Sequence, residues 1–532
     1  MNNSSEKSVI VALFILFLTY GLFLPHYPVV NADELWETSR GYYLKTEHRP
    51  GEPLLPASVA PFYSSIGNLG WKSWCILTVK TGTFAAMMTI LPVDELSAMR
   101  YGTFLWSLIL LFMTYILARL MKLSKWPALM TVAIVMFIPD FFAQIHRERS
   151  EILIGACLLI GLWMFLNALE AENRKQRLLW WTVTGIYSWL PALLIHPSAI
   201  LIPASVGVLY LILERKNIIS FNTILLGIGL AGGAVFFLFI MNAMKEYAIA
   251  AGGGNYFQYQ GPPILTKGVK YFIGLPYGFY NRFISVNLFS RPISFLVYVA
   301  AFILITKQWL KKDEILEQRS FVVIGITLLV SLGILYFLSG SFGNYNVIIA
   351  PFVAILLVSY FQKRTELKLL PVTLMLILIA SNVPGFTSDG AYAKEYTRMT
   401  SRVREKIDRQ SPVLGLALYY NPFKDQAYYS NSWFNPYGGR IEQSFEQACD
   451  TLKVKYIIVD DAFVSRALLD RGRAWTDSMF MTLQNRGEVI DSFHANYFVG
   501  NRVPSPDFFP DYWQYPGQEK LFIHQVKIYK LN

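Results

Sequence analysis

The chain has little charge and few cysteines. Only 16% of its 532 residues are charged, with 36 acidic against 47 basic side chains, whereas 54% are hydrophobic. Cys75, Cys157 and Cys449 are too few and too scattered for a disulfide framework or a metal cluster. The first apolar run ends in Pro-His-Tyr-Pro without a small-residue cleavage site, so we expect an uncleaved span. This composition predicts a polytopic membrane protein.

The distribution of basic residues argues against nucleic-acid binding. A net charge of +11 would suggest nucleic acid in a soluble protein, but here Lys and Arg form short clusters between apolar runs, near 119–125, 174–177, 215–216, 307–312 and 363–364. The positive-inside rule places these clusters and the N-terminus in the cytoplasm. We therefore expect the loops 26–98 and 245–289, and everything after Pro384, to face outward.

Apolar runs predict about eleven membrane crossings. They lie near 9–25, 99–119, 127–143, 152–169, 178–195, 197–213, 221–244, 290–309, 320–339, 345–361 and 367–384. Trp71–Leu91 is not counted, because it would invert every later loop and because Lys72 and Lys80 are costly in hydrocarbon. With Trp71 and Trp74 as headgroup anchors, we expect it to form a helix in the outer interface.

A cluster of carboxylates follows the first span directly. The stretch Asn31-Ala32-Asp33-Glu34-Leu35-Trp36-Glu37 holds three acidic residues within five positions. Near a membrane surface, such a group could supply the base of a membrane enzyme. The alternative is that Asp33 caps an interfacial helix by accepting from its first-turn amides. Helical spacing places Asp33, Glu37 and Arg40 on one side of this helix.

Two further outward connections carry polar residues. The loop after the third crossing, residues 144–151, contains His146, Arg149 and Glu151. At the mouth of a helical bundle these groups would face a cavity and are functional candidates; the alternative is an interfacial Arg–Glu pair that snorkels. His196, before Pro197, is either a hydrogen-bonded turn residue or a ligand.

The composition changes after Pro384, which predicts a transmembrane domain over 1–384 and a soluble outer (periplasmic) α/β domain over 385–532. Tyr392–Asp408 reads as a helix, and strand-like runs follow at Val413–Tyr419, Lys455–Val459, Glu488–Phe493 and Leu521–Tyr529. We interpret Asp460-Asp461 as a strand-end turn rather than a catalytic dyad. The Tyr and Trp content of this domain would suit covering a site or gripping a glycan.

Four short motifs together resemble a known superfamily. They are Asp33-Glu34 after the first span, Met99-Arg100-Tyr101 at the second, Arg149-Ser150-Glu151 after the third and Ile195-His196-Pro197 after the fifth. In order and spacing they resemble the GT-C membrane glycosyltransferases, and more narrowly the family of protein O-mannosyltransferases and lipid A aminoarabinose transferase. The likeness covers about the first 215 residues. A departure is that Pro53-Leu54-Leu55-Pro56 stands where relatives often have Lys-Pro-Pro.

The resemblance implies a GT-C-like fold and an inverting glycosyltransferase of the bacterial cytoplasmic (inner) membrane. Such an enzyme passes a hexosyl or pentosyl group from a polyprenyl-phosphate donor to a lipid, glycan or protein acceptor at the outer face, among membrane lipids and without nucleic acid. No cofactor is firmly implied, no metal ligand is assigned, and a divalent metal remains open. Asp33 would be the catalytic base, and the substrate-binding candidates are Glu34, Lys72, His146, Arg149, Glu151, His196 and Arg282.

Two other classes of protein remain as alternatives. A lipid-linked oligosaccharide polymerase or ligase would share many spans and a large outer loop, but Asp-Glu directly after the first span is not expected there. A transporter of lipid-linked glycans would need polar groups at mid-membrane in repeated halves, and the sequence shows no such internal repeat.

Overall fold

The computed structural model describes the parts of the chain that follow. They are residues 32–48, 78–145, 150–214, 221–250, 292–311, 317–338, 345–364, 369–431, 434–435, 443–496 and 523–532, with Leu54 and parts of 11–18. The chain divides into two compact units. The membrane unit comprises Met1–Phe23, Tyr101–Ile240 and Gly261–Gly385, and the sheet unit comprises Leu24–Arg100, Met241–Gln260 and Phe386–Asn532.

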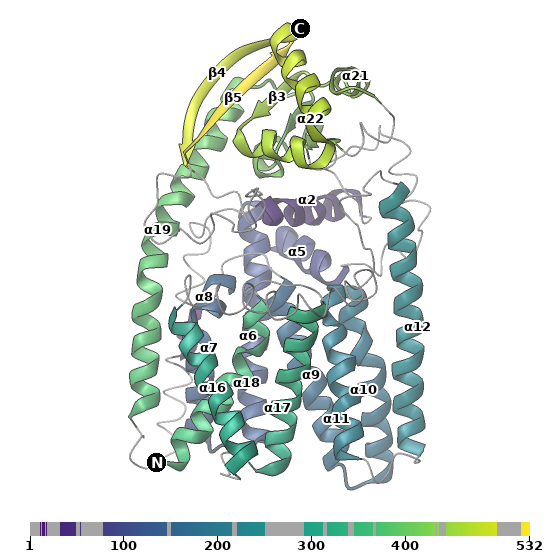
Figure 1. Cartoon of the computed structure of the whole chain (residues 1–532), viewed down its shortest axis with the longest axis vertical. Helices are drawn as coiled ribbons and strands as arrows, with labels where there is room; N and C mark the ends of the chain where they lie inside the picture. The colour runs from purple at the N-terminus through teal and green to yellow at the C-terminus, as the bar shows by residue number, and fades with distance from the viewer. Residues whose placement is uncertain are drawn as a thin grey trace. The chain divides into compact units, whose positions relative to one another are not determined.

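The membrane unit is built from apolar helices (Figure 1). They are α6 (Glu95–Leu120), α7 (Lys125–Phe137), α8 (Pro139–Ile145), α9 (Ser150–Glu170), α10 (Arg174–Leu194), η2 (Pro197–Ile200), α11 (Leu201–Leu213), α12 (Phe221–Ala250), α16 (Pro292–Lys311), α17 (Gln318–Leu332) with the π-turn η5 (Gly333–Leu338), α18 (Asn346–Lys363) and the first part of α19 (Leu370–Lys406). Five of the described helices, α6, α9, α16, α17 continued into η5, and α18, are long and apolar enough to cross a membrane. The predicted polytopic α-helical class is confirmed.

Helices α9 and α18 form the centre of the membrane unit, since both are buried along most of their length. Small residues allow close packing around them. A Cβ added at Gly155 of α9 would lie 2.8 Å from Leu110 Cδ1 and 3.6 Å from the Ile348 backbone of α18. Helices α10 and α12 cross at Gly185 and Gly229, where an added Cβ at Gly229 would lie 3.0 Å from the Gly185 backbone.

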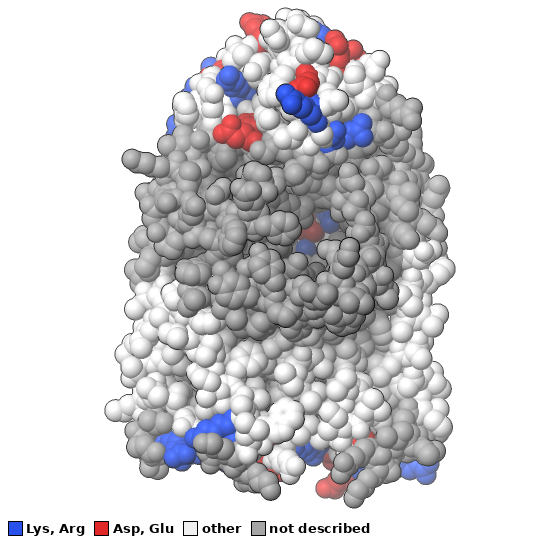
Figure 2. Space-filling view, viewed as in Figure 1, with Lys and Arg blue, Asp and Glu red and all other residues white. Residues whose placement is uncertain are grey.

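Charged residues of several helix ends meet at one end of the membrane unit. Lys122, after α6, lies 2.6 Å from Glu317 at the start of α17, and Arg319 lies 3.9 Å from Glu170 at the end of α9. Lys and Arg gather at this end on the face drawn in Figure 2. The end of α6, the end of α9 and the start of α17 therefore lie at one end of the membrane unit.

Two helix boundaries differ from the sequence-based prediction. The span expected at 127–143 is broken at Ile138, whose ψ of 126° is not helical. Pro139 explains the break, because proline disfavours the helical conformation in the residue before it. Conversely, α19 continues from Leu370 to Lys406 without ending at Pro384, so the change of composition there marks no end of the helix.

The sheet unit contains a five-stranded mixed sheet in the order β2-β1-β3-β5-β4. Strands β1 (Val413–Gly415), β2 (Tyr428–Ser430) and β3 (Tyr456–Val459) are parallel, whereas β5 (Ile523–Leu531) pairs antiparallel with β3 and with β4 (Gly487–Asn496). The short helices η8 (Ala417–Tyr419) and η9 (Asn421–Phe423) follow β1. The predicted α/β class is confirmed, and three of the expected strands correspond to β3, β4 and β5. The strand expected at Val413–Tyr419 is shorter, because β1 ends at Gly415 and the 3-10 helix η8 takes its place over 417–419.

Asp460 begins helix α22 (Asp461–Arg486) rather than forming a dyad. Its carboxylate accepts from the Phe463 amide (2.7 Å) and from the Tyr419 hydroxyl (2.7 Å), and the residue is buried. This use as a helix N-cap agrees with the structural interpretation of the Asp460-Asp461 pair.

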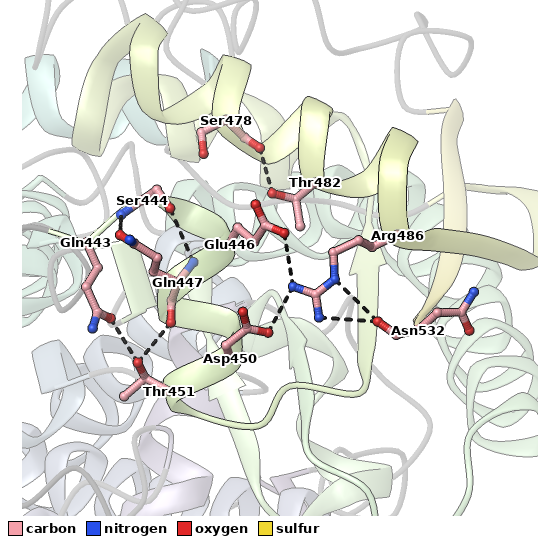
Figure 3. Close-up of polar contacts among 10 residues, drawn as sticks. All are labelled: Gln443, Ser444, Glu446, Gln447, Asp450, Thr451, Ser478, Thr482, Arg486 and Asn532. Atoms are coloured by element: carbon pink, nitrogen blue, oxygen red, sulfur yellow. Dashed lines mark hydrogen bonds and ion pairs between the residues drawn. The ribbon is translucent and has the colours of Figure 1, made fainter.

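Arg486 ties the end of α22 to α21 (Phe445–Thr451), as Figure 3 shows. Its Nη1 lies 3.2 Å from Glu446 and 2.9 Å from Asp450, and its Nε and Nη2 donate to the backbone oxygen of Asn532. Ser444 and Gln447 form a capping box at the start of α21. This polar network fixes one edge of the sheet unit.

The last turns of α19 attach to strand β4. Arg402 donates two hydrogen bonds to Asp491 (2.8 and 2.7 Å), which lowers the pKa of that carboxyl. Beyond the helix, Asp408 accepts from the amides of Gln410 and Ser411 and from the Ser411 hydroxyl. Slight burial acts to raise the pKa of Asp408, but these hydrogen bonds outweigh it and lower the pKa to about 2.

A hydrophobic core joins the sheet to residues from the first hundred positions of the chain. Helices α2 (Ala32–Glu47) and α5 (Thr78–Ile90) and the start of α6 supply Leu35, Phe84 and Met99, which are fully buried in the same cluster as Ile457 and Ile528 of the sheet. Burial of each such side chain contributes roughly 1.5–3 kcal/mol. The segment around α2 and α5 is therefore part of the sheet unit, and α5 lies within the stretch Trp71–Leu91.

Candidate active site

Helix α2 carries the acidic motif in its first turn. Asp33 and Glu34 are the second and third residues of the helix, and Lys45 lies in its last turn. Acidic residues at the start and a basic residue at the end both interact favourably with the helix dipole. The side chains of Asp33 and Glu34 are outside the described part of the structure, so their role stays a prediction.

Glu37, one turn after Asp33, pairs with two cations. Its Oε1 lies 3.1 Å from Arg40 Nη1 on the same helix and 3.2 Å from Lys80 Nζ on α5. The Lys80 side chain is only 5% exposed. The sequence suggested that Lys80 would be costly in hydrocarbon. In the structure its ammonium is instead buried against the carboxylate of Glu37. This group of charges links α2 to α5.

The start of α6 packs on the same helix. The Thr38 hydroxyl of α2 donates to Met99 Sδ (3.2 Å), and Met99 and Arg100 are both buried. Helix α2, which carries Asp33-Glu34, and the start of α6, which carries Met99-Arg100, are thus in contact at Thr38 and Met99. Sequence spacing alone could not have predicted this contact, because 61 residues separate Thr38 from Met99.

The membrane unit holds the other two described candidates. Glu151 lies in the first turn of α9 and is 3% exposed, one turn before the close contact of Gly155 with α18. His196 is half-buried and caps η2, where its Nδ1 accepts from the Ser198 amide (3.1 Å). The capping role agrees with the turn-residue alternative for His196, and a role in substrate binding stays a prediction for both.

A further buried carboxylate, Asp140 of α8, was not singled out from the sequence. It is fully buried and accepts from the Tyr298 hydroxyl of α16 (3.0 Å) and the Asn346 amide of α18 (3.4 Å). The available signal was its position directly after Pro139, at the end of an apolar run. Asp140 thereby joins α8 to α16 and α18.

Four of the predicted substrate-binding residues lie outside the described residues: Lys72, His146, Arg149 and Arg282. Among the residues that the structure does describe, no group of three or more His, Cys, Asp or Glu side chains is arranged to hold a metal ion.

Comparison with known proteins identifies the architecture. A scan against protein-family models gives no match, and a search of curated proteins gives none. Among solved structures, the chain is similar to ArnT from Cupriavidus metallidurans, a lipid A aminoarabinose transferase, in the apo state (TM-score 0.59, 10% identity, 99% of this chain and 98% of that one). ArnT bound to undecaprenyl phosphate gives a TM-score of 0.55 at 12% identity, over 90% of this chain and 96% of that one.

The chain has the GT-C fold. A second GT-C protein, the oligosaccharyltransferase of Archaeoglobus fulgidus in its apo form, is similar with a TM-score of 0.54 at 10% identity, over 95% of this chain and 76% of that one. The resemblance drawn from the four motifs is thereby confirmed at the level of fold. At such low identity, the likeness of this chain to its structural neighbours shows the fold alone and carries no statement about its substrates.

Proposed function

We propose that this GT-C protein is an inverting glycosyltransferase that moves a monosaccharide from a polyprenyl-phosphate donor to a hydroxyl group of a cell-envelope lipid, glycan or protein. The observation that carries the proposal is the similarity over nearly the full length of both chains to ArnT, whose structure was solved with undecaprenyl phosphate. The membrane-spanning helices of this chain suit a donor that is itself a membrane lipid.

The reaction needs a base, an in-line approach and stabilisation of the leaving group. Asp33 would take the proton of the acceptor hydroxyl as its oxygen attacks the anomeric carbon. The bond between that carbon and the phosphate oxygen breaks, and polyprenyl phosphate leaves. A single displacement of this kind inverts the anomeric configuration. Holding the two reactants in line would supply a large part of the acceleration.

Cationic residues would receive the phosphate. Arg149, Lys72 and Arg282 are assigned this role because guanidinium and ammonium groups stabilise a departing phosphate, with Arg able to bind it bidentately. Glu34, Glu151, His146 and His196 would contact the sugar or the acceptor. We place the reaction at the outer face of the bacterial cytoplasmic membrane, since the basic loops at the other end of the helices mark the cytoplasmic side.

A second candidate is transfer of a lipid-linked oligosaccharide, which the similarity to an archaeal oligosaccharyltransferase favours. Monosaccharide transfer is preferred, because the chain spans 96–98% of ArnT but 76% of the oligosaccharyltransferase.

The test supplies purified protein in lipid nanodiscs with radiolabelled polyprenyl-phosphate hexoses and pentoses and with envelope extracts as acceptors. The proposal predicts acceptor-dependent release of polyprenyl phosphate from at least one of these donors, with inversion at the anomeric carbon. Transfer only from a lipid-linked oligosaccharide would favour the second candidate and contradict the first.

A further inference from the structure

The segment between η9 and β2 contacts the helix that carries Asp33. The Tyr42 hydroxyl of α2 donates to Asp425 Oδ1 (2.6 Å). The Lys424 ammonium lies 2.5 Å from Glu95 Oε1 at the start of α6 and 5.2 Å from the centre of the Tyr42 ring. Burial, and then the hydrogen bond to Asp425, raise the pKa of Tyr42, so its hydroxyl keeps its proton and remains a donor.

This segment is itself held firmly by the sheet. Phe423 is buried and stacks on Tyr428 of β2 with ring centres 5.8 Å apart. Gln426 donates to the backbone oxygen of Ser411 (2.8 Å) and accepts from Arg404 (2.8 Å). The two charged residues between Phe423 and Gln426 are therefore presented to α2 and α6 from a fixed backbone.

Helix α5 contacts α2 as well. Gly41 is so close to α5 that an added Cβ would lie 3.2 Å from Phe84 Cβ, and Lys45 donates to the backbone oxygen of Met88 (2.9 Å). Tyr42 lies nine residues after Asp33, which is about 13.5 Å along a helix. The segment thus contacts α2 far from Asp33 along the helix, and α2 itself connects Tyr42 to Asp33.

We propose that Lys424 and Asp425 are positioning residues that set the placement of α2, and through it of Asp33, from the sheet. The proposal rests on the proposed function for the role of Asp33. A misplacement of about 1 Å far from the reacting atoms can cost roughly a hundredfold in rate, so loosening α2 should be visible in turnover. Holding α2 in place is then one role of the C-terminal part of the chain.

The test compares the full-length double variant Lys424→Met/Asp425→Ala with Arg486→Met as a matched control. Arg486 holds α21 and α22 together through Glu446, Asp450 and the backbone oxygen of Asn532 (Figure 3). Hydrogen–deuterium exchange measures how firmly the backbone of α2 is held, and it does not depend on any activity. We expect amides of 39–47 to exchange about tenfold faster in the double variant, which corresponds to losing one charge-assisted hydrogen bond, and to be unchanged in the control.

Turnover provides the second readout. In the double variant kcat should fall about tenfold with the donor KM unchanged, and the control should keep wild-type kcat. Lys424→Glu should also lower kcat, and adding Glu95→Lys should restore it by reversing the ion pair. If the double variant does not fold, Tyr42→Phe replaces it in both measurements, because it keeps the ring and removes only the hydrogen bond to Asp425. The same direction of change is expected.

Unchanged α2 exchange in the double variant, or an equal loss of kcat in Arg486→Met, would overturn the positioning role. Faster α2 exchange together with undiminished transfer by Asp33→Asn would support the placement of α2 and refute the role of Asp33 as the base. Faster α2 exchange together with no transfer by the wild type from any polyprenyl-phosphate donor would refute the proposed function instead.

Discussion

Replacing Glu37 with alanine removes the carboxylate that both Lys80 and Arg40 contact. The Lys80 side chain is 5% exposed and Glu37 is 12% exposed, whereas Arg40 at 22% is better able to reach solvent. Removing one partner of a buried ion pair costs about 3–5 kcal/mol, because the remaining charge stays out of water. We expect about 3 kcal/mol for Glu37→Ala, since some solvent reaches the carboxylate.

Differential scanning calorimetry of the full-length protein in detergent measures this cost. For a unit of this size, about 3 kcal/mol corresponds to a fall in Tm of roughly 6–12 °C. The matched variant is Glu37→Ala with Lys80→Met, which replaces the buried ammonium by an apolar chain of similar length and should recover most of the loss. A fall below about 2 °C for Glu37→Ala, or no recovery in the double variant, would refute the reasoning.

Three further predictions concern the two units. Gly229→Ala should destabilise the contact of α10 with α12, because its Cβ would meet the Gly185 backbone at 3.0 Å; Gly229→Ser should be at least as harmful, read from Tm in detergent. Asp140→Ala should cost about 1–3 kcal/mol by leaving the buried Tyr298 hydroxyl without that acceptor, and Asp140→Asn should cost less. Asp408, with a pKa of about 2, should stabilise the fold above about pH 4 and lose that contribution as pH falls through 2. The Tm difference between wild type and Asp408→Asn should therefore shrink between pH 5 and pH 2, and a constant difference would contradict it.

Much of the fold could be predicted because its signals are local. Long apolar runs specify membrane helices, and the strand at Lys455–Val459 reads directly from its apolar residues. Strand β2 was missed because three residues, Tyr428–Ser430, give no periodicity. The continuous α19 is not predictable from the sequence alone, because Pro384 and the change of composition after it are typical of a helix end, whereas the helix runs on to Lys406.

For the candidate site, the sequence predicts which residues to consider but not which of them contact one another. The motifs at Asp33 and at Met99 could be read from their order along the spans. That Lys80 would be buried against Glu37, and that Asp425 would hold Tyr42 across 383 residues of sequence, depends on tertiary packing and has no local signal. Lys80 stands out in the sequence as a charge in an apolar stretch, but its partner Glu37 does not.

The central claim is that Asp33 is the base of a glycosyl transfer. The decisive measurement is the turnover of purified, folded Asp33→Asn protein with a polyprenyl-phosphate sugar that the wild type uses, beside Glu34→Gln as a matched neutralisation. Asn caps a helix about as well as Asp, so a purely structural role predicts near-normal transfer. Loss of a general base predicts a fall of roughly a hundredfold or more with donor binding retained. A hundredfold fall for Asp33→Asn supports the account, and near-normal turnover would contradict it.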